Sequence, residues 1–133
     1  MYQLGKNSRS VFGPENNLEL ISEFGISTIE ILDLSSCKEI DMKALARNAP
    51  IFKSLTSLIL QRCRLQKEDT EFLVSLFDKT PALIYLDIKQ NSLDLIKILD
   101  AVKILPELAY LLVDGNPKPK GFLEEMRKRE LHI

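Results

Sequence analysis

One short pattern recurs along the chain and limits the folds open to it. The pattern is apolar-x-apolar-x-x-Asn/Cys, and it occurs five times, at residues 2–7, 32–37, 58–63, 86–91 and 111–116. The intervals between its Asn/Cys positions are 30, 26, 28 and 25 residues. Self-similarity at such a period indicates an array in which each copy forms one structural unit.

Two of the copies extend to a longer signature. Residues 55–65 and 83–93 fit L-x-x-L-x-L-x-x-N/C-x-L almost completely, and the equivalent upstream apolar positions of two further copies hold Ile29 and Leu108. In these residues the chain resembles a leucine-rich repeat protein, and its repeat length is similar to that of the longer, ribonuclease-inhibitor-like type. The pattern departs at both ends, because the first copy lacks the upstream apolar residue and the last continues into Pro117.

The resemblance implies an α/β fold of a particular kind, the leucine-rich-repeat solenoid. This is a right-handed β/α superhelix with a short parallel sheet on its concave face, helices on its convex face and a C-terminal cap helix. Residues 1–133 would then form a single domain of about four and a half repeats, with 117–133 as the cap. Each copy of such an array buries its inward residues only against its neighbours, so several copies and a terminal cap are needed.

Within each copy, apolar residues alternate at the strand period of two and are predicted to face the core. Leu58 and Leu60 form one such pair, and equivalent pairs recur in the later copies. The Asn or Cys at the end of each strand is expected to serve the backbone of the adjoining turn, because a buried amide must satisfy its hydrogen bonds. Cys37 and Cys63 would fill the same narrow slot as the asparagines.

Apolar residues at helical spacing predict helices between the strands. The predicted segments are 14–24, 42–49, 67–79, a helix that Ser92 caps and that ends before Pro106, and the cap helix 122–130. Pro50, Pro81 and Pro106 each precede the next strand, where a proline ends the helix and sets up the turn.

The N-terminal end of the array has no cap in the sequence, because the first predicted strand begins at Tyr2. An uncovered strand edge attracts pairing with another chain. We therefore expect this edge to be covered by a partner, to continue into a longer protein, or to be short enough to be tolerated. Self-association through the edge is one form of the first option.

The charge balance argues against two classes of partner. The chain has 18 Lys+Arg and 19 Asp+Glu residues, a formal net charge of −1, whereas nucleic acids and anionic membranes select a basic surplus. Segment 117–133 has five positive and three negative residues but no interleaved aromatic platform, which favours a solvated cap helix over a nucleic-acid site. No apolar stretch approaches the roughly 20 residues of a membrane span, and residues 1–10 lack the apolar core of a secretory signal. We expect an intracellular, cytoplasmic protein, with a secreted effector as the alternative.

The side chains that support catalysis are few. His132 is the only histidine, and it stands one residue from the end of the sequence, where chains fray. Cys37 and Cys63 share the ladder position of adjacent copies and are expected to be buried, reduced and inert. No histidine accompanies either thiol to activate it. The sequence therefore predicts a protein that is not an enzyme.

Three aspartates are candidate cation ligands. Asp33 and Asp87 occupy one strand position in nonadjacent copies, with Ile59 between them, and Asp114 stands two positions further along its copy. A hard cation needs several oxygens that converge at about 2.0–2.6 Å. We therefore expect no metal site and no cofactor, and no small-molecule substrate.

The outward strand positions predict the functional surface. They lie between the inward rows, on the concave face, and group apolar and aromatic side chains where the fold itself does not bury them. The predicted partner-binding residues are Ile31, Asp33, Ile59, Arg62, Tyr85, Asp87, Lys89, Tyr110 and Leu112. Tyr85 and Tyr110 hold equivalent positions in adjacent copies and are predicted to be energetic anchors. The alternative is that the cap covers Tyr110 and Leu112.

These features predict a non-enzymatic interaction module, a repeat scaffold that binds a protein partner through its concave face. The resemblance does not name the partner, because one fold serves many functions. Two other interpretations stay open. The chain would be a substrate-recognition fragment or regulator of an enzyme, or a bacterial effector that acts on host proteins.

Overall fold

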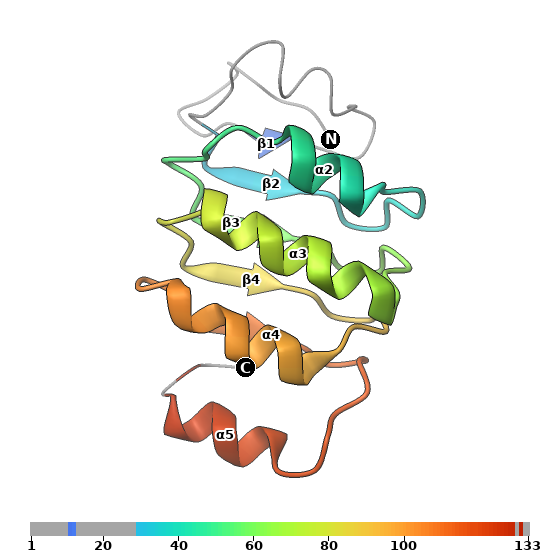
Figure 1. The fold of residues 1–133 in the computed structure, drawn as a ribbon, viewed down its shortest axis with the longest axis vertical. Helices are drawn as coiled ribbons and strands as arrows, with labels where there is room; N and C mark the ends of the chain where they lie inside the picture. Colours follow the sequence, from blue (N-terminus) through green and yellow to red (C-terminus); the bar gives the residue numbers. More distant parts are fainter. Residues whose placement is uncertain (1–10, 13–28, 130, 132–133) are drawn as a thin grey trace.

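The computed structural model describes residues 11–12, 29–129 and 131. Three predictions lie outside these residues, namely the strand-like segment 2–7, the helix over 14–24 and the position of His132. Within the described residues the chain is an α/β protein, in which a parallel sheet lies behind a column of helices (Figure 1).

Short strands form a single sheet in the order of the sequence. They are β1 (Val11–Phe12), β2 (Ile31–Asp33), β3 (Ser57–Ile59), β4 (Tyr85–Asp87) and β5 (Tyr110–Leu112), and all pairings are parallel. The register is constant from β2 to β5, so that Leu32, Leu58, Leu86 and Leu111 lie side by side. These four leucines are fully buried, and each contributes about 1.5–3 kcal/mol of hydrophobic stabilisation. The predicted stacking of the inward leucines is confirmed.

The strand beside β2 is Val11–Phe12, a strand that the repeated pattern did not predict, while the strand predicted from Tyr2 lies outside the described residues. Val11 pairs with Ile31, and Phe12 pairs with Leu32. The copy at 2–7 matched only the short pattern, whereas Val11 and Phe12 are a β-branched and an aromatic residue, both favoured in strands. The edge of β2 that faces the N-terminus is thus paired.

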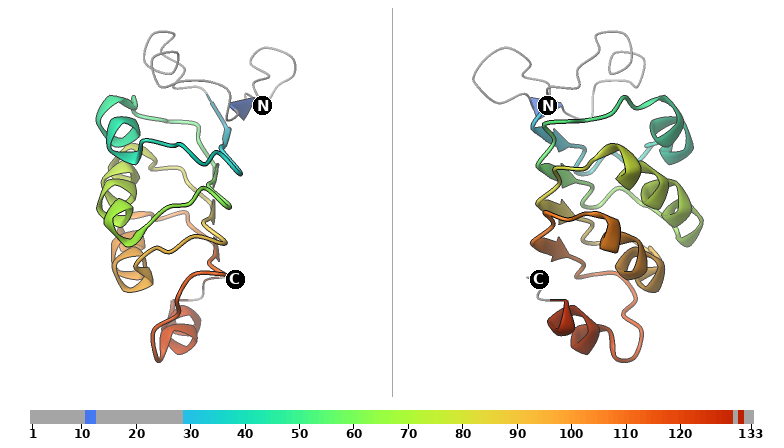
Figure 2. Two further views of the ribbon diagram at one scale, coloured as in Figure 1. Left: turned by 90° about the vertical axis from the view of Figure 1, so that its right-hand side faces the viewer. Right: turned by 60° about the vertical axis from the view of Figure 1, so that its left-hand side comes forward.

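The helices lie on one side of the sheet, and the two further views separate the two layers (Figure 2). Helices α2 (Met42–Asn48), α3 (Thr70–Leu76) and α4 (Leu95–Ala101) follow β2, β3 and β4 in turn, and α5 (Phe122–Lys128) follows β5. A 3-10 turn precedes α3 at Lys67–Asp69, a second follows it at Phe77–Lys79, and a third follows α4 at Val102–Ile104. The predicted helices in the segments 42–49, 67–79 and 122–130 are confirmed within the described residues.

The helix predicted to start at Ser92 begins later. Asp94 caps α4, because its carboxylate accepts hydrogen bonds from the backbone N–H groups of Ile96 and Lys97 at 3.1 and 3.3 Å. Ser92 is still part of the extended connection, where its N–H donates to the Leu65 carbonyl at 2.8 Å. A carboxylate also interacts favourably with the helix dipole, so Asp94 is the better cap of the two.

The polar residue at the end of β4 bonds two neighbouring turns together. Oδ1 of Asn91 accepts hydrogen bonds from the N–H groups of Cys63 and Leu65 at 3.1 and 3.0 Å. Its Nδ2 donates to the carbonyls of Leu60 and Ile88 at 2.9 and 3.0 Å. Each of these groups would cost about 1–3 kcal/mol if it were buried without a partner. The prediction that this residue serves the adjoining turn is confirmed.

The same hydrogen bond recurs one strand away in both directions. Nδ2 of Asn116 donates to the Ile88 carbonyl at 2.8 Å, and Sγ of Cys63 donates to the Leu34 carbonyl at 2.9 Å. We call the bonds that Cys63, Asn91 and Asn116 make to the backbone the strand-end ladder. A thiol supplies a weak donor and no amide oxygen, so Cys63 satisfies fewer groups than either asparagine.

The residue before each strand-end position has a left-handed backbone. Its φ is 61° at Ser36, 56° at Arg62, 59° at Gln90 and 84° at Gly115. This conformation costs an L-residue roughly 1–2 kcal/mol and costs glycine little. Space is also short at the last of these turns, because a Cβ added to Gly115 would lie 2.9 Å from Cα of Gln90. Gly115 is therefore required by both conformation and packing.

Replacing Gly115 with Ala should destabilise the protein more than the same change at Gly121. Both glycines have positive φ, 84° and 81°, but a Cβ at Gly121 meets no atom within 4 Å. We expect Gly121→Ala to cost about 1–2 kcal/mol from backbone strain alone, and Gly115→Ala to cost about 3 kcal/mol or more. Urea denaturation of the two variants measures the difference, and equal costs would contradict the close approach of Gly115 to Gln90.

Candidate functional site

Alternate strand residues project on the side of the sheet away from α2, α3 and α4. We call this side the strand face, and Figure 2 shows it free of the helices described. In β2 and β3 the middle residue is buried and its two neighbours are half-buried. Four predicted residues, Ile31, Asp33, Ile59 and Leu112, are half-buried on this face. The structure therefore brings the predicted outward row together on one surface.

Tyr85 and Tyr110 lie side by side on the strand face. They are register partners in β4 and β5, and their ring centroids are 6.0 Å apart with planes inclined by 43°. Tyr110 is 44% exposed and Tyr85 is half-buried. The alternative in which the cap buries Tyr110 and Leu112 does not hold, since neither residue is buried. Leu112, two residues after Tyr110 in β5, is half-buried as well.

Asp87 is a correction to the predicted set, because it is only 4% exposed. Its Oδ1 accepts a hydrogen bond from the N–H of Lys89 at 3.0 Å, and its Oδ2 lies 3.9 Å from Nζ of the same lysine. An aspartate that bonds the backbone two residues later stabilises a turn. Asp87 also stands in register between Ile59 of β3 and Leu112 of β5, so it has neighbours on both sides. Asp87 therefore supports the strand end and is not available as a contact residue.

Asp33 uses the same turn bond but stays accessible. Its Oδ1 accepts hydrogen bonds from the N–H and the hydroxyl of Ser35 at 3.0 and 2.6 Å, and the residue is half-buried. Glu30, the residue before β2, is also half-buried. Neither carboxylate forms an ion pair with any residue that the structure describes.

Arg62 and Lys89 lie at the strand ends and form the rim of the strand face. Arg62 is exposed in the left-handed turn after β3, where its Nε donates to Oε1 of Gln90 in the next turn. Lys89 is half-buried beside Asp87. Both predicted residues are thus at the border of the surface. Lys89 has an acidic partner in Asp87, whereas Arg62 has none among the described residues.

The two cysteines differ in burial. Cys63 is 2% exposed, as predicted, whereas Cys37 is half-buried, so the prediction of a fully buried thiol is wrong there. Burial raises the pKa of the Cys63 thiol from 9.0 to about 11. The thiolate is the reactive form, so Cys63 is inert near neutral pH.

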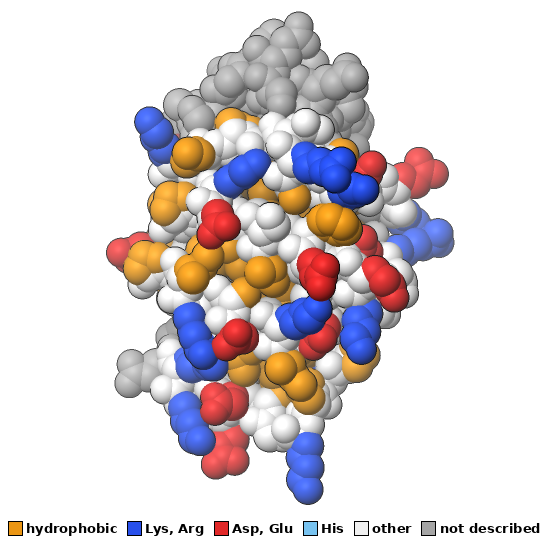
Figure 3. All heavy atoms as spheres, in the orientation of Figure 1, with side chains coloured by type: hydrophobic (Ala, Val, Ile, Leu, Met, Phe, Trp, Pro, Cys, Tyr) orange, Lys and Arg blue, Asp and Glu red, His pale blue; other side chains and the backbone are white. Residues whose placement is uncertain are grey.

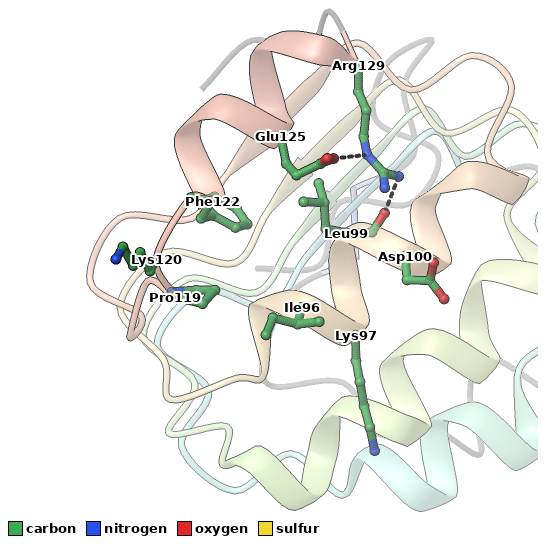
Figure 4. Close-up of a pocket in the computed structure, with 10 residues that line it drawn as sticks. Ile96, Lys97, Leu99, Asp100, Pro119, Lys120, Phe122, Glu125 and Arg129 are labelled. Atoms are coloured by element: carbon green, nitrogen blue, oxygen red, sulfur yellow. Dashed lines mark hydrogen bonds and ion pairs between the residues drawn. The ribbon is translucent and has the colours of Figure 1, made fainter.

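A hollow of about 390 Å³ lies between α4 and α5, away from the predicted surface (Figure 4). Ile96, Pro119 and Phe122 line it with apolar surface. Arg129 donates to the Leu99 carbonyl at 2.6 Å and lies 3.7 Å from the carboxylate of Glu125, which is its neighbour on α5. The guanidinium is thus engaged within the protein, and the hollow does not define a ligand. Sequence patterns do not predict this hollow, because its residues come from two helices and a loop.

The helix side shows no comparable continuous surface. In Figure 3 hydrophobic side chains are interspersed there with Lys, Arg, Asp and Glu. Several of these charges pair with each other, as Lys97 does with Glu71 at 3.0 Å and Lys103 with Asp100 at 2.8 Å. The second pair holds the pKa of Asp100 below its usual value through the Lys103 hydrogen bond and charge.

The part of the chain that the structure describes has neither a membrane-spanning helix nor a cluster of metal ligands. There, no helix has the length and apolar character to cross a membrane. Over the same residues, no three His, Cys, Asp or Glu side chains converge to hold a metal ion.

No protein-family model matches the chain, and no curated protein matches it. The class of the protein must then follow from the strand register, the strand-end ladder and the strand face.

The pKa of Cys63 predicts a pH-dependent stability. Because the folded state holds the thiol proton up to about pH 11 and the unfolded state only to about pH 9, the folded state binds more protons between these values. The Cys63 contribution should be complete below pH 9 and lost as the pH rises to 11, with a slope of at most about 1.4 kcal/mol per pH unit. Urea denaturation of wild type and Cys63→Ala across pH 8–11 tests this. Parallel profiles of the two proteins would contradict the shift, whereas convergence above pH 9 agrees with it.

Proposed function

We propose that this chain is a solenoid of the leucine-rich-repeat type that binds a protein partner through its strand face. The constant register of Leu32, Leu58, Leu86 and Leu111 supports the repeat architecture. The strand-end ladder supports it independently, because equivalent residues make equivalent bonds at successive strands. In this proposal α5 is the C-terminal cap, with Phe122 and Met126 buried at 3% and 1% exposure.

The observation that carries the binding function is the Tyr85–Tyr110 pair on the strand face. Two aromatic rings in contact, with Leu112 on the same strand as Tyr110, place apolar area where the protein's own core does not use it. Tyrosine is enriched in the few residues that dominate protein interfaces, because it offers area at low entropic cost and a hydroxyl to bond. A grouped apolar surface of this kind is typical of a protein-binding site.

The remaining residues have graded roles in the proposal. Ile31 and Ile59 extend the apolar surface toward β2, and their half-buried side chains keep part of their area available. Arg62 and Lys89 belong to the polar rim, where charges change the association rate more than the affinity. Asp33 is the accessible carboxylate of the face.

Loss of the two tyrosines should remove binding and leave the fold. We expect the double substitution Tyr85→Ala and Tyr110→Ala to weaken the binding of a partner by about 1–4 kcal/mol for each tyrosine. The melting transition should stay cooperative. The matched control is Ile96→Ala with Ile104→Ala, which removes two isoleucines on the helix side, 63% and 52% exposed.

The measurement is affinity purification from lysate of the source cells, with wild type, tyrosine variant and isoleucine variant compared by quantitative mass spectrometry. Proteins bound by wild type and by the isoleucine variant, and lost from the tyrosine variant, agree with the proposal. If the tyrosine variant melts like wild type and keeps the same bound proteins, the strand face is not the binding surface. Circular dichroism of each variant shows whether the fold is retained.

A further inference from the structure

Cys37 and Cys63 occupy equivalent positions in the turns that follow β2 and β3. The register between these strands joins Asp33 to Ile59, 26 residues later, and the same offset separates the two cysteines. Neighbouring strands lie about 4.8 Å apart. A disulfide requires two Cα atoms about 4.4–6.8 Å apart, so residues one strand spacing apart are within its range.

Hydrogen bonds keep the two turns in register as far as the cysteines. The N–H of Ser36 donates to the Gln61 carbonyl at 2.8 Å. The Leu34 carbonyl then accepts from both cysteines, from the backbone N–H of Cys37 at 3.1 Å and from Sγ of Cys63 at 2.9 Å. Because both donors bond the same oxygen atom, they are at most about 6 Å apart. The Cys63 sulfur is therefore held beside the Cys37 backbone.

The two thiols differ in their access to a dissolved reagent. Cys37 is half-buried, whereas Cys63 is 2% exposed. Burial also raises the pKa of Cys63 to about 11, and the thiolate is the form that reacts with an oxidant. A dissolved oxidant therefore reacts first at Cys37.

The fold tolerates loss of the Cys63 proton. When Sγ of Cys63 no longer donates to the Leu34 carbonyl, that carbonyl keeps its bond from the Cys37 N–H. The bond that is lost has a thiol donor, which is weak. Asn91 and Asn116 hold the equivalent positions after β4 and β5, so among the described turns only those after β2 and β3 have this thiol pair.

We propose that Cys37 and Cys63 are a modification site at which a peroxide links the turns after β2 and β3 by a disulfide. The Cys37 thiolate sulfur bonds one peroxide oxygen as the O–O bond breaks, and the hydroxide that leaves takes a proton from solvent. The Cys63 sulfur then bonds the sulfenic sulfur as its S–O bond breaks, and the departing hydroxide takes the Cys63 proton. The two thiols lose two electrons and two protons, and the peroxide becomes two water molecules.

The second step takes place within one molecule, so proximity offsets the low thiolate fraction of Cys63. The cross-link closes a loop that contains α2 and β3. A disulfide of this kind stabilises a fold mainly because it restricts the unfolded chain. Oxidation therefore ties β2 to β3 and makes this part of the sheet harder to unfold.

The experiment uses the full chain, reduced with dithiothreitol, desalted and treated with hydrogen peroxide near neutral pH. Trypsin places Cys37 in peptide 10–38 and Cys63 in the dipeptide 63–64, so a linked pair of these peptides identifies the disulfide. Cys37→Ser and Cys63→Asn are treated in parallel. The second variant introduces the residue that the ladder has at Asn91 and Asn116, and circular dichroism shows whether each variant folds.

Wild type should lose the mass of two hydrogen atoms without forming dimers, and peptides 10–38 and 63–64 should be linked. Its melting temperature should rise by about 5–15 °C and return to the starting value with dithiothreitol. Peroxide should not raise the melting temperature of Cys37→Ser. Cys63→Asn should accumulate a sulfenic acid at Cys37 that dimedone traps, because no second thiol removes it.

Results on wild type alone would overturn the inference, whether or not the variants fold. Linkage only between molecules, or a sulfinic acid at Cys37 while Cys63 stays a thiol, would show that the two sulfurs do not meet. A disulfide that lowers the melting temperature would show that the native turns do not fit the cross-link. Two unreacted thiols, under conditions that oxidise glutathione completely, would show that peroxide does not reach Cys37. None of these results bears on the strand face, which is a separate surface.

Discussion

The strand-end ladder is the constraint on which the described structure depends. At the end of each short strand the chain must turn away from the sheet, and the turn buries backbone groups that no strand can pair. Asn91 binds five backbone groups, three from the end of β3 and two from the end of its own strand β4. Asn116 and Cys63 each donate an equivalent bond to the strand before them. These bonds fix the register from β2 to β5. The in-register leucines can then pack as a continuous buried row.

The proposed binding surface follows from that register. When inward residues are aligned at every strand, the outward residues are aligned as well, and Tyr85 meets Tyr110 for the same reason that Leu86 meets Leu111. The helices stabilise the other side of the sheet and leave the strand face available. Position in the sheet then modifies this face, since Asp87 is buried between its register partners Ile59 and Leu112.

Much of this arrangement was predictable from the sequence, because each strand has the same short pattern and the alternation of two fixes which residues face inward. The leucine row, the roles of Asn91 and Asn116 and the pairing of the tyrosines all follow from it. The burial of Asp87 did not, because strand alternation alone does not show that Asp87 has a neighbour in register on both sides whereas Asp33 pairs only with β3. The left-handed backbone at Arg62 and Gln90 was not predictable from the sequence. Glycine is the residue expected in this conformation, and Gly115 is the one glycine among the four equivalent residues. The strand at Val11–Phe12 was missed because it is two residues long and lies outside the repeated pattern.

Amide hydrogen exchange measured by NMR tests the ladder most directly. The N–H groups of Cys63 and Leu65 both donate to Asn91 Oδ1, although they lie in a turn and not in a strand. If the ladder holds the strands in register, these two amides should exchange only through global unfolding, as slowly as the amide of Leu58 in the buried leucine row. Exchange of Cys63 and Leu65 at the rate of open turn amides, while Leu58 stays protected, would contradict the account.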